Sequence, residues 1–86
     1  MYKIALTKKS EKEYKSLYSA NRVIFERIRK AIYAIAKDPY QGKPLKFELK
    51  ERWSYRVGSY RIIYTIEHSV LTICIIDIGH RREVYR

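Results

Sequence analysis

The hydrophobic and polar positions follow a helical period in the first half of the chain and a strand period in the second. Residues 2–6 are a short apolar run typical of a strand. Residues 8–19 and 22–38 place apolar side chains three and four positions apart, which predicts two amphipathic helices. The Thr7 hydroxyl can cap the first helix, and Pro39 ends the second because proline disfavours the helical conformation before it.

The second half predicts three strands joined by short turns, at residues 53–57, 60–67 and 70–78. The last strand is apolar on both faces, which is typical of a central strand, and Gly79 is expected to end it. Residues 45–49 are either a short strand or an extended loop, and residues 84–86 are a candidate for edge pairing. The turn-rich residues 38–44 separate the helical half from this strand half.

This order of elements predicts an α+β fold, with two N-terminal helices packed on one face of a mostly antiparallel sheet of four or five strands (β-α-α-β-β-β). A chain of 86 residues is too short for two ordinary domains, so residues 1–86 are expected to form one. Within residues 60–67, alternation places Tyr60, Ile62, Tyr64 and Ile66 on the core face and Arg61 on the other.

Charge is the most informative part of the composition. Lys and Arg number 19 against 9 Asp and Glu, a formal net charge of +10 that is spread through both halves. Such a cation suits a polyanionic partner: nucleic acid, an acidic protein or an anionic membrane. The longest apolar stretch falls far short of the ~20 residues of a membrane span, and no secretory signal is present, so we expect a cytoplasmic protein.

Several kinds of catalytic site are excluded by the residues available. The chain has no glycine-rich phosphate loop, no cysteine pair and no paired-histidine spacing, so no metal or cofactor is expected. Its few carboxylates are scattered, and His68 and His80 are predicted at opposite ends of one region of strand. Cys74 is alone in an apolar run, where a thiol is usually a buried hydrophobe.

A group of basic and phenolic residues remains late in the chain: Lys46, Lys50, Arg52, Arg56, Arg61, His80, Arg81, Arg82 and Tyr85. They are interleaved with aromatic rings at Trp53, Tyr55 and Tyr60. Cations that bind phosphate among rings that stack on bases are typical of single-stranded nucleic-acid sites. The alternatives are solvated charges at Arg52 and Arg56, and core packing for at least two of the rings Trp53, Tyr60 and Tyr64.

Residues 56–64 (Arg-Val-Gly-Ser-Tyr-Arg-Ile-Ile-Tyr) and 77–85 (Asp-Ile-Gly-His-Arg-Arg-Glu-Val-Tyr) resemble the RelE/ParE superfamily of toxin–antitoxin toxins, and within it the RelE branch. The resemblance implies a RelE-like two-layer sandwich and an endoribonuclease that cuts mRNA in the ribosomal A site. In this family a 2′-hydroxyl attacks the adjacent phosphate without a metal. The resemblance also implies an acidic cognate antitoxin, with DNA contacted only through the antitoxin complex.

The resemblance further implies roles for individual residues. Arg61 matches an arginine on the scissile phosphate, Arg81 one near the leaving oxygen, and Tyr85 a tyrosine for stacking or proton handling. Lys46 and Lys50 lie in the segment that supplies catalytic lysines, and His80 is either catalytic or structural. The remaining candidates for RNA contact are Arg52, Arg56, Arg82 and Trp53. A fixed, planar guanidinium suits phosphate better than it suits proton transfer.

Two other functions remain open at this point. A ParE-like toxin that poisons DNA gyrase would share the fold, although residues 79–82 and 84–85 favour the RelE type. A basic domain without catalytic activity, which binds nucleic acid or an acidic partner, would share the charge.

Overall fold

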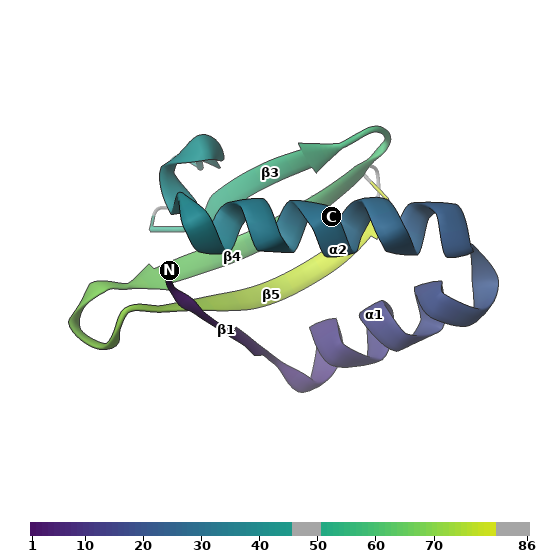
Figure 1. Cartoon of the computed structure of the whole chain (residues 1–86), viewed down its shortest axis with the longest axis horizontal. Coiled ribbons are helices and arrows are strands. Elements are labelled where there is room, and N and C mark those ends of the chain that lie inside the picture. Colours follow the sequence, from purple (N-terminus) through teal and green to yellow (C-terminus); the bar gives the residue numbers. More distant parts are fainter. Residues whose placement is uncertain (46–50, 81–86) are drawn as a thin grey trace.

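The computed structural model of the chain describes residues 1–45 and 51–80. Its elements follow the predicted order (Figure 1): β1 (Lys3–Leu6), α1 (Lys8–Ala20), α2 (Arg22–Lys37), the 3₁₀ turn η1 (Pro39–Gln41), β2 (Lys43–Pro44), β3 (Trp53–Val57), β4 (Tyr60–Glu67), the 3₁₀ turn η3 (His68–Val70) and β5 (Thr72–His80). The candidate strands at 45–49 and 84–86 lie outside the described residues, except that Leu45 is not in a strand.

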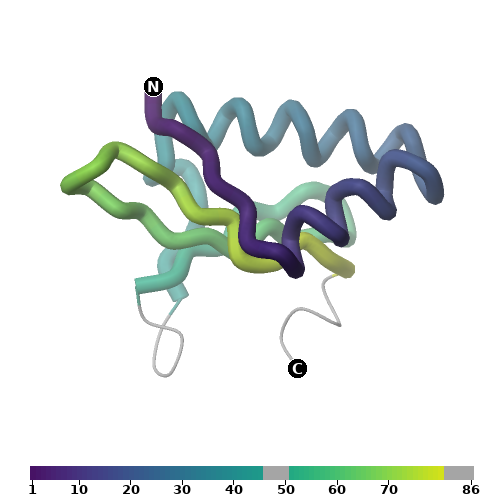
Figure 2. The backbone as a smooth tube through the Cα atoms, turned by 90° about the horizontal axis from the view of Figure 1, so that it is seen from below, coloured from purple at the N-terminus to yellow at the C-terminus, as the bar shows by residue number. Residues whose placement is uncertain are grey.

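The strands form one five-stranded sheet in the order β1-β5-β4-β3-β2. Every neighbouring pair is antiparallel except β1 and β5, which are parallel. Both helices cover the same face of this sheet, as the view along the sheet in Figure 2 shows. The predicted α+β architecture, with a helix pair on one face of a mostly antiparallel sheet, is therefore confirmed.

The helix ends lie where local side-chain chemistry predicts them. The Thr7 hydroxyl accepts a hydrogen bond from the Ser10 amide at 3.1 Å and so caps α1. Asn21 ends α1 and caps α2, because its side-chain oxygen accepts from the Ile24 amide at 3.1 Å. The second helix stops at Lys37, shortly before Pro39.

The core lies between α2 and the sheet. Ile28 and Ile35 of α2 are fully buried there, together with Ile62 and Tyr64 of β4. Each buried aliphatic side chain contributes about 1.5–3 kcal/mol of hydrophobic stabilisation. Trp53 and Tyr60 pack partly buried against the same cluster, so core packing is confirmed for these rings, and the predicted facing of β4 is correct.

Strand β5 differs from the predicted strand at both ends and contains a bulge: it begins at Thr72, because Val70 lies in η3. Ile63 is opposite Asp77 but Tyr64 is opposite Ile75, so Ile76 is an extra, bulged residue. Side chains beyond the bulge therefore change faces. The expectation that Gly79 ends the strand is wrong, because antiparallel pairing with β4 carries β5 through Gly79 to His80.

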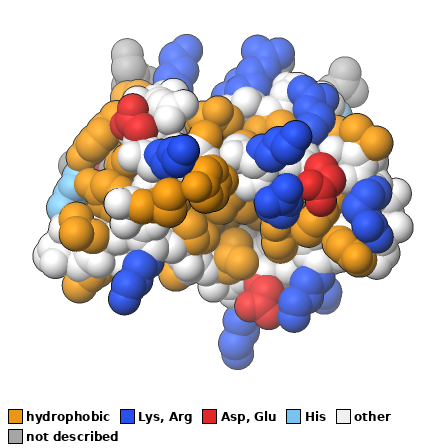
Figure 3. All heavy atoms as spheres, viewed as in Figure 1, with side chains coloured by type: hydrophobic (Ala, Val, Ile, Leu, Met, Phe, Trp, Pro, Cys, Tyr) orange, Lys and Arg blue, Asp and Glu red, His pale blue; other side chains and the backbone are white. Residues whose placement is uncertain are grey.

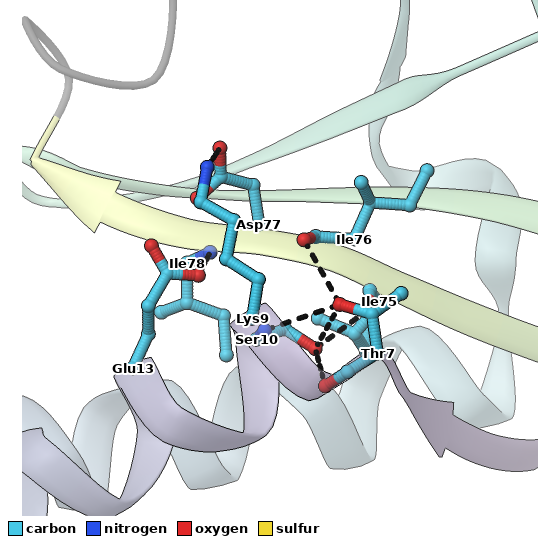
Figure 4. Close-up of polar contacts among 8 residues, drawn as sticks. All are labelled: Thr7, Lys9, Ser10, Glu13, Ile75, Ile76, Asp77 and Ile78. Atoms are coloured by element: carbon cyan, nitrogen blue, oxygen red, sulfur yellow. Dashed lines mark hydrogen bonds and ion pairs between the residues drawn. The ribbon is translucent and has the colours of Figure 1, made fainter.

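Side chains of α1 complete the hydrogen bonding of β5 where β1 stops (Figure 4). The Thr7 amide donates to the Ile75 carbonyl at 3.2 Å, and the Ser10 hydroxyl donates to the same oxygen at 2.7 Å. The Thr7 hydroxyl donates to the Ile76 carbonyl at 3.3 Å. The start of α1 thus takes the place of a neighbouring strand, which keeps buried backbone groups paired.

Lys and Arg side chains are spread across the helix-covered side of the molecule, with fewer carboxylates between them (Figure 3). Among the described residues, neither helix is long and apolar enough to cross a membrane.

Candidate active site

Cationic side chains from three strands share the sheet face that the helices leave uncovered. Arg56 of β3 is directly opposite Arg61 of β4, and Lys43 of β2 is directly opposite Ser54 of β3. Opposite residues in an antiparallel pair point to the same side, with Cβ atoms about 4.5–5.5 Å apart. Ser54 and Arg56 are two positions apart on one strand, so all four side chains project from the same face.

A pocket of about 590 Å³ opens among these residues. It is lined by Gln41, Gly42, Lys43, Pro44, Ser54, Tyr55, Arg56 and Arg61. Its three cations and its polar groups can hold a phosphodiester, because Arg and Lys are the side chains that most often contact phosphate oxygens.

Arg61 makes a hydrogen bond to a buried serine within this pocket. Its Nη1 atom donates a hydrogen bond to the Ser54 hydroxyl at 3.0 Å, and Ser54 is only 2% exposed. This hydrogen bond helps to fix the direction of the guanidinium group in the pocket. The arrangement therefore places an oriented guanidinium group at the pocket, where it can contact an anionic ligand.

Gly42 lines the pocket and packs closely against the buried Tyr64 hydroxyl. The Tyr64 hydroxyl donates to the Pro39 carbonyl at 2.6 Å, and burial raises the pKa of this phenol to about 12, so it stays neutral. A Cβ atom on Gly42 would collide with the Tyr64 hydroxyl and would lie 3.0 Å from the Ser54 carbonyl oxygen. The absence of a side chain at Gly42 is what lets the chain pass this close and bring Lys43 to the pocket.

The structure brings together two of the site residues expected from sequence, Arg61 and Arg56. Arg52 is exposed just before β3 and does not line the pocket. Lys46, Lys50, Arg81, Arg82 and Tyr85 lie outside the described residues.

Trp53 and His80 lie on the opposite, helix-covered side of the sheet. Trp53 is opposite Tyr64, and its ring centroid is 5.4 Å from that of Tyr40 in an edge-on contact. His80 is opposite Tyr60 and makes a T-shaped contact with it at 5.8 Å. The bulge at Ile76 explains the position of His80. Because one extra residue is inserted, the side chains that follow it in β5 point to the opposite face from the one expected from strict alternation.

Sequence reasoning missed Lys43 and Ser54. Ser54 could have been found, because it alternates with Arg56 within the predicted strand 53–57. Lys43 gives no such signal: it reaches the pocket through the two-residue strand β2, which is too short to show a period and pairs with β3.

A second group of titratable side chains lies on the α1 side of β5 (Figure 4). Glu13 Oε1 accepts a hydrogen bond from the Ile78 amide at 3.0 Å, and Lys9 Nζ is 2.9 Å from Asp77 Oδ2. Burial, and after it a hydrogen bond with Asp77, raises the pKa of Glu13 to about 7. In the described part of the chain, no three His, Cys, Asp or Glu side chains gather as metal ligands would.

The family model and the curated relatives that match this chain are all described as toxins. The family model described as the ParE toxin of the type II toxin–antitoxin system parDE matches residues 4–85. The toxin RelG of Mycobacterium tuberculosis is 33% identical over 66 residues, which cover 76% of each chain. The toxin YoeB of Synechocystis is 38% identical over 76 residues, covering 83% of this chain and 88% of that one.

Among solved structures, the toxin–antitoxin complex RelBE2 from Mycobacterium tuberculosis contains a chain that superposes with a TM-score of 0.82 at 27% identity. The match covers 93% of this chain and 98% of that one. The two segments that carry the sequence resemblance, 56–64 and 77–85, both lie within the span of the family model.

Proposed function

Because the chain belongs to the ParE family of type II toxin–antitoxin toxins, within the RelE/ParE superfamily, we propose that it acts as an endoribonuclease that cuts messenger RNA in the ribosomal A site. The observation that best supports this activity is the pocket in which Ser54 orients Arg61, with Lys43 and Arg56 beside it. This proposal places the chain in the cytoplasm, where ribosomes translate mRNA.

In the proposed reaction the 2′-oxygen of one nucleotide forms a bond to the adjacent phosphorus, and the bond from phosphorus to the 5′-oxygen breaks. The products are a 2′,3′-cyclic phosphate and a free 5′-hydroxyl. Arg61 binds the reacting phosphate and stabilises the charge that builds on its oxygens. Lys43 and Arg56 hold phosphate oxygens at the same pocket.

The reaction also needs a base for the 2′-hydroxyl proton and an acid for the leaving oxygen. The sequence resemblance supports three candidates for these tasks: Lys46, Lys50 and Tyr85. Arg81, which matches an arginine near the leaving oxygen, would stabilise the charge that develops there and would not transfer the proton. His80 is left out of the proposal because its side chain lies on the helix-covered face.

We further propose that an acidic cognate antitoxin neutralises the toxin. One relative of known structure was crystallised as the toxin–antitoxin complex RelBE2, and the net charge of +10 of this chain suits an acidic segment that folds as it binds. Such a partner would cover the Arg61 pocket or an element that borders it. Amide-exchange protection in the complex would locate it, and protection confined to surfaces away from β2, β3 and β4 would contradict this placement.

The nuclease is tested by incubating the purified chain with ribosomes programmed with mRNA and mapping the new 5′ ends. We expect Arg61→Ala to slow cleavage roughly 10²–10³-fold, the usual effect of removing one charge-stabilising group. Arg29→Ala is the matched control, because Arg29 is exposed on α2 and pairs with Glu26. Equal rates for wild type and Arg61→Ala, or salt-sensitive binding without any cleavage, would refute the proposal.

A gyrase poison is the second candidate, and the ParE description of the matching family model is the observation that favours it. Loss of DNA supercoiling in expressing cells, with transcripts left intact, would establish this alternative in place of the nuclease.

A further inference from the structure

Arg27 extends from α2 to the turn between β3 and β4. Gly58 in this turn has a φ of +60°, and a Cβ atom placed on it would lie 3.5 Å from both terminal nitrogens of Arg27. On the other side, Arg56 Nε donates to the Gly58 carbonyl at 3.2 Å. The two guanidinium groups thus flank a single residue and lie within about 10 Å of each other.

Arg56 is also the direct cross-strand neighbour of Arg61. Arg61, Arg56 and Arg27 therefore form a continuous series, the arginine row, that runs from the pocket over the β3–β4 turn to α2. Neighbouring members are about 5–10 Å apart, which is on the order of one to three nucleotide repeats along a strand. Among the described residues, neither Arg27 nor Arg56 forms a salt bridge with a carboxylate.

We propose that the arginine row binds the backbone of the RNA strand that flanks the cleaved phosphate, so that the strand leaves the pocket across the β3–β4 turn. This inference rests on the proposed nuclease function and adds a path for the substrate. The turn residues beside the row, Gly58 and Ser59, are exposed and carry no apolar side chain, and Val57 is only 7% exposed. A peptide that folds on binding needs apolar anchors, whereas a phosphate backbone needs only charge, so the row favours RNA over an acidic protein segment.

The test measures binding of the full-length chain to single-stranded RNAs of three and twelve nucleotides, 2′-O-methylated throughout to prevent cleavage. We expect Arg27→Gln to weaken binding of the longer RNA roughly 3- to 10-fold and to leave the shorter one unchanged. The slope of log affinity against log salt for the longer RNA should fall by about 0.7, the value for one lost phosphate contact. Arg29→Gln removes the same charge from another side of α2 and should change neither RNA.

A second pair of variants tests the same path without altering Arg27. Ser59 is exposed in the turn, so Ser59→Asp adds a negative charge to the path and Ser59→Asn is its neutral control. We expect the Asp variant alone to weaken binding of the longer RNA. Polyglutamate is the competing probe: if Arg27→Gln weakens polyglutamate binding as much as RNA binding, the row is a site for acidic protein.

The inference would also be overturned if Arg27→Gln weakened both RNAs equally, or if Arg29→Gln matched it. Cleavage is scored separately on unmodified mRNA. A chain that shows the length-dependent effect of Arg27→Gln but never cuts would retain the path and lose the nuclease. A chain that cuts mRNA, and in which Arg27→Gln weakens neither RNA, would retain the nuclease and lose the path.

Discussion

Arg56 and Arg61 are directly opposite each other across the β3–β4 pair, so two positively charged side chains share one face of the sheet. Like charges in this position destabilise the folded chain. The structure keeps this repulsion at the pocket, where a bound phosphate would turn it into attraction. Stability of the free protein and affinity for an anion are therefore in conflict at these two residues.

Replacing Arg56 by Gln should separate these two effects. We expect the free energy of unfolding of the free chain to rise by about 0.2–1 kcal/mol, because the cross-strand repulsion is removed. RNA binding should weaken in the same variant. Thermal unfolding and binding titrations measure the two quantities. The gain in stability should disappear in about 1 M salt, which screens exposed charges, and a gain that persists there would contradict this explanation.

Ser54→Ala should lower the cleavage rate by acting through Arg61. Loss of one hydrogen bond to a charged group costs about 1.5–3 kcal/mol, so we expect roughly a 10- to 100-fold fall in kcat with a smaller change in KM. Single-turnover cleavage is the measurement. If Ser54 serves only to position Arg61, adding Ser54→Ala to Arg61→Ala should cost nothing more, and additive losses would show an independent role.

Gly42→Ala should destabilise the fold and displace Lys43. The added methyl group meets the Tyr64 hydroxyl and the Ser54 carbonyl, and overpacking of this kind costs about 1–3 kcal/mol. Denaturant unfolding would measure the loss. Tyr64→Phe in the same chain removes the hydroxyl, so the double variant should lose less than the sum of the two single variants. Simple additivity would argue against the close contact.

Glu13 should make stability depend on pH. Its pKa rises from an ordinary value of 4.5 to about 7 in the folded chain, so between these values the folded state holds a proton that the unfolded state has lost. The contribution of Glu13 to stability is therefore greatest below about pH 4.5, falls as the pH rises from about 4.5 to 7, and is constant above that range. Because solvent screens this partly exposed group, we expect a fall of about 1–2 kcal/mol.

Glu13→Gln is the control for that pH dependence. The amide oxygen can still accept from the Ile78 amide but carries no charge at any pH. Unfolding curves between pH 4.5 and 8 should lose most of their slope in this variant, and the variant should be more stable than wild type at pH 8. An unchanged slope would mean that another group titrates in this range.

The sequence predicted those parts of the fold that depend on neighbouring residues. Thr7 caps a helix through an amide three positions away, and Pro39 limits the helix directly before it. Alternation along β4 likewise placed Arg61 on the uncovered face, which is why the central residue of the candidate pocket could be found. Each of these features is encoded within a few consecutive positions.

The features that were missed depend on contacts between distant segments. The extra residue Ile76 becomes visible only in the pairing of β5 with β4, and it decides that His80 lies away from Arg61. The strand β2 has two residues, too few for any periodicity, and Lys43 enters the pocket only because β2 pairs with β3. Hydrogen-bond registers of this kind are set by the whole sheet.

The hydrogen bonds from Thr7 and Ser10 to β5, which take the place of a neighbouring strand, also limit pairing with other molecules. An extended segment from another molecule that approached Ile75 and Ile76 would find their outward carbonyl oxygens already engaged by Thr7 and Ser10. At the far border of the sheet, β2 is short and contains Pro44, a residue that discourages edge-to-edge assembly. Both features leave fewer free backbone groups at which a strand from a second molecule could pair.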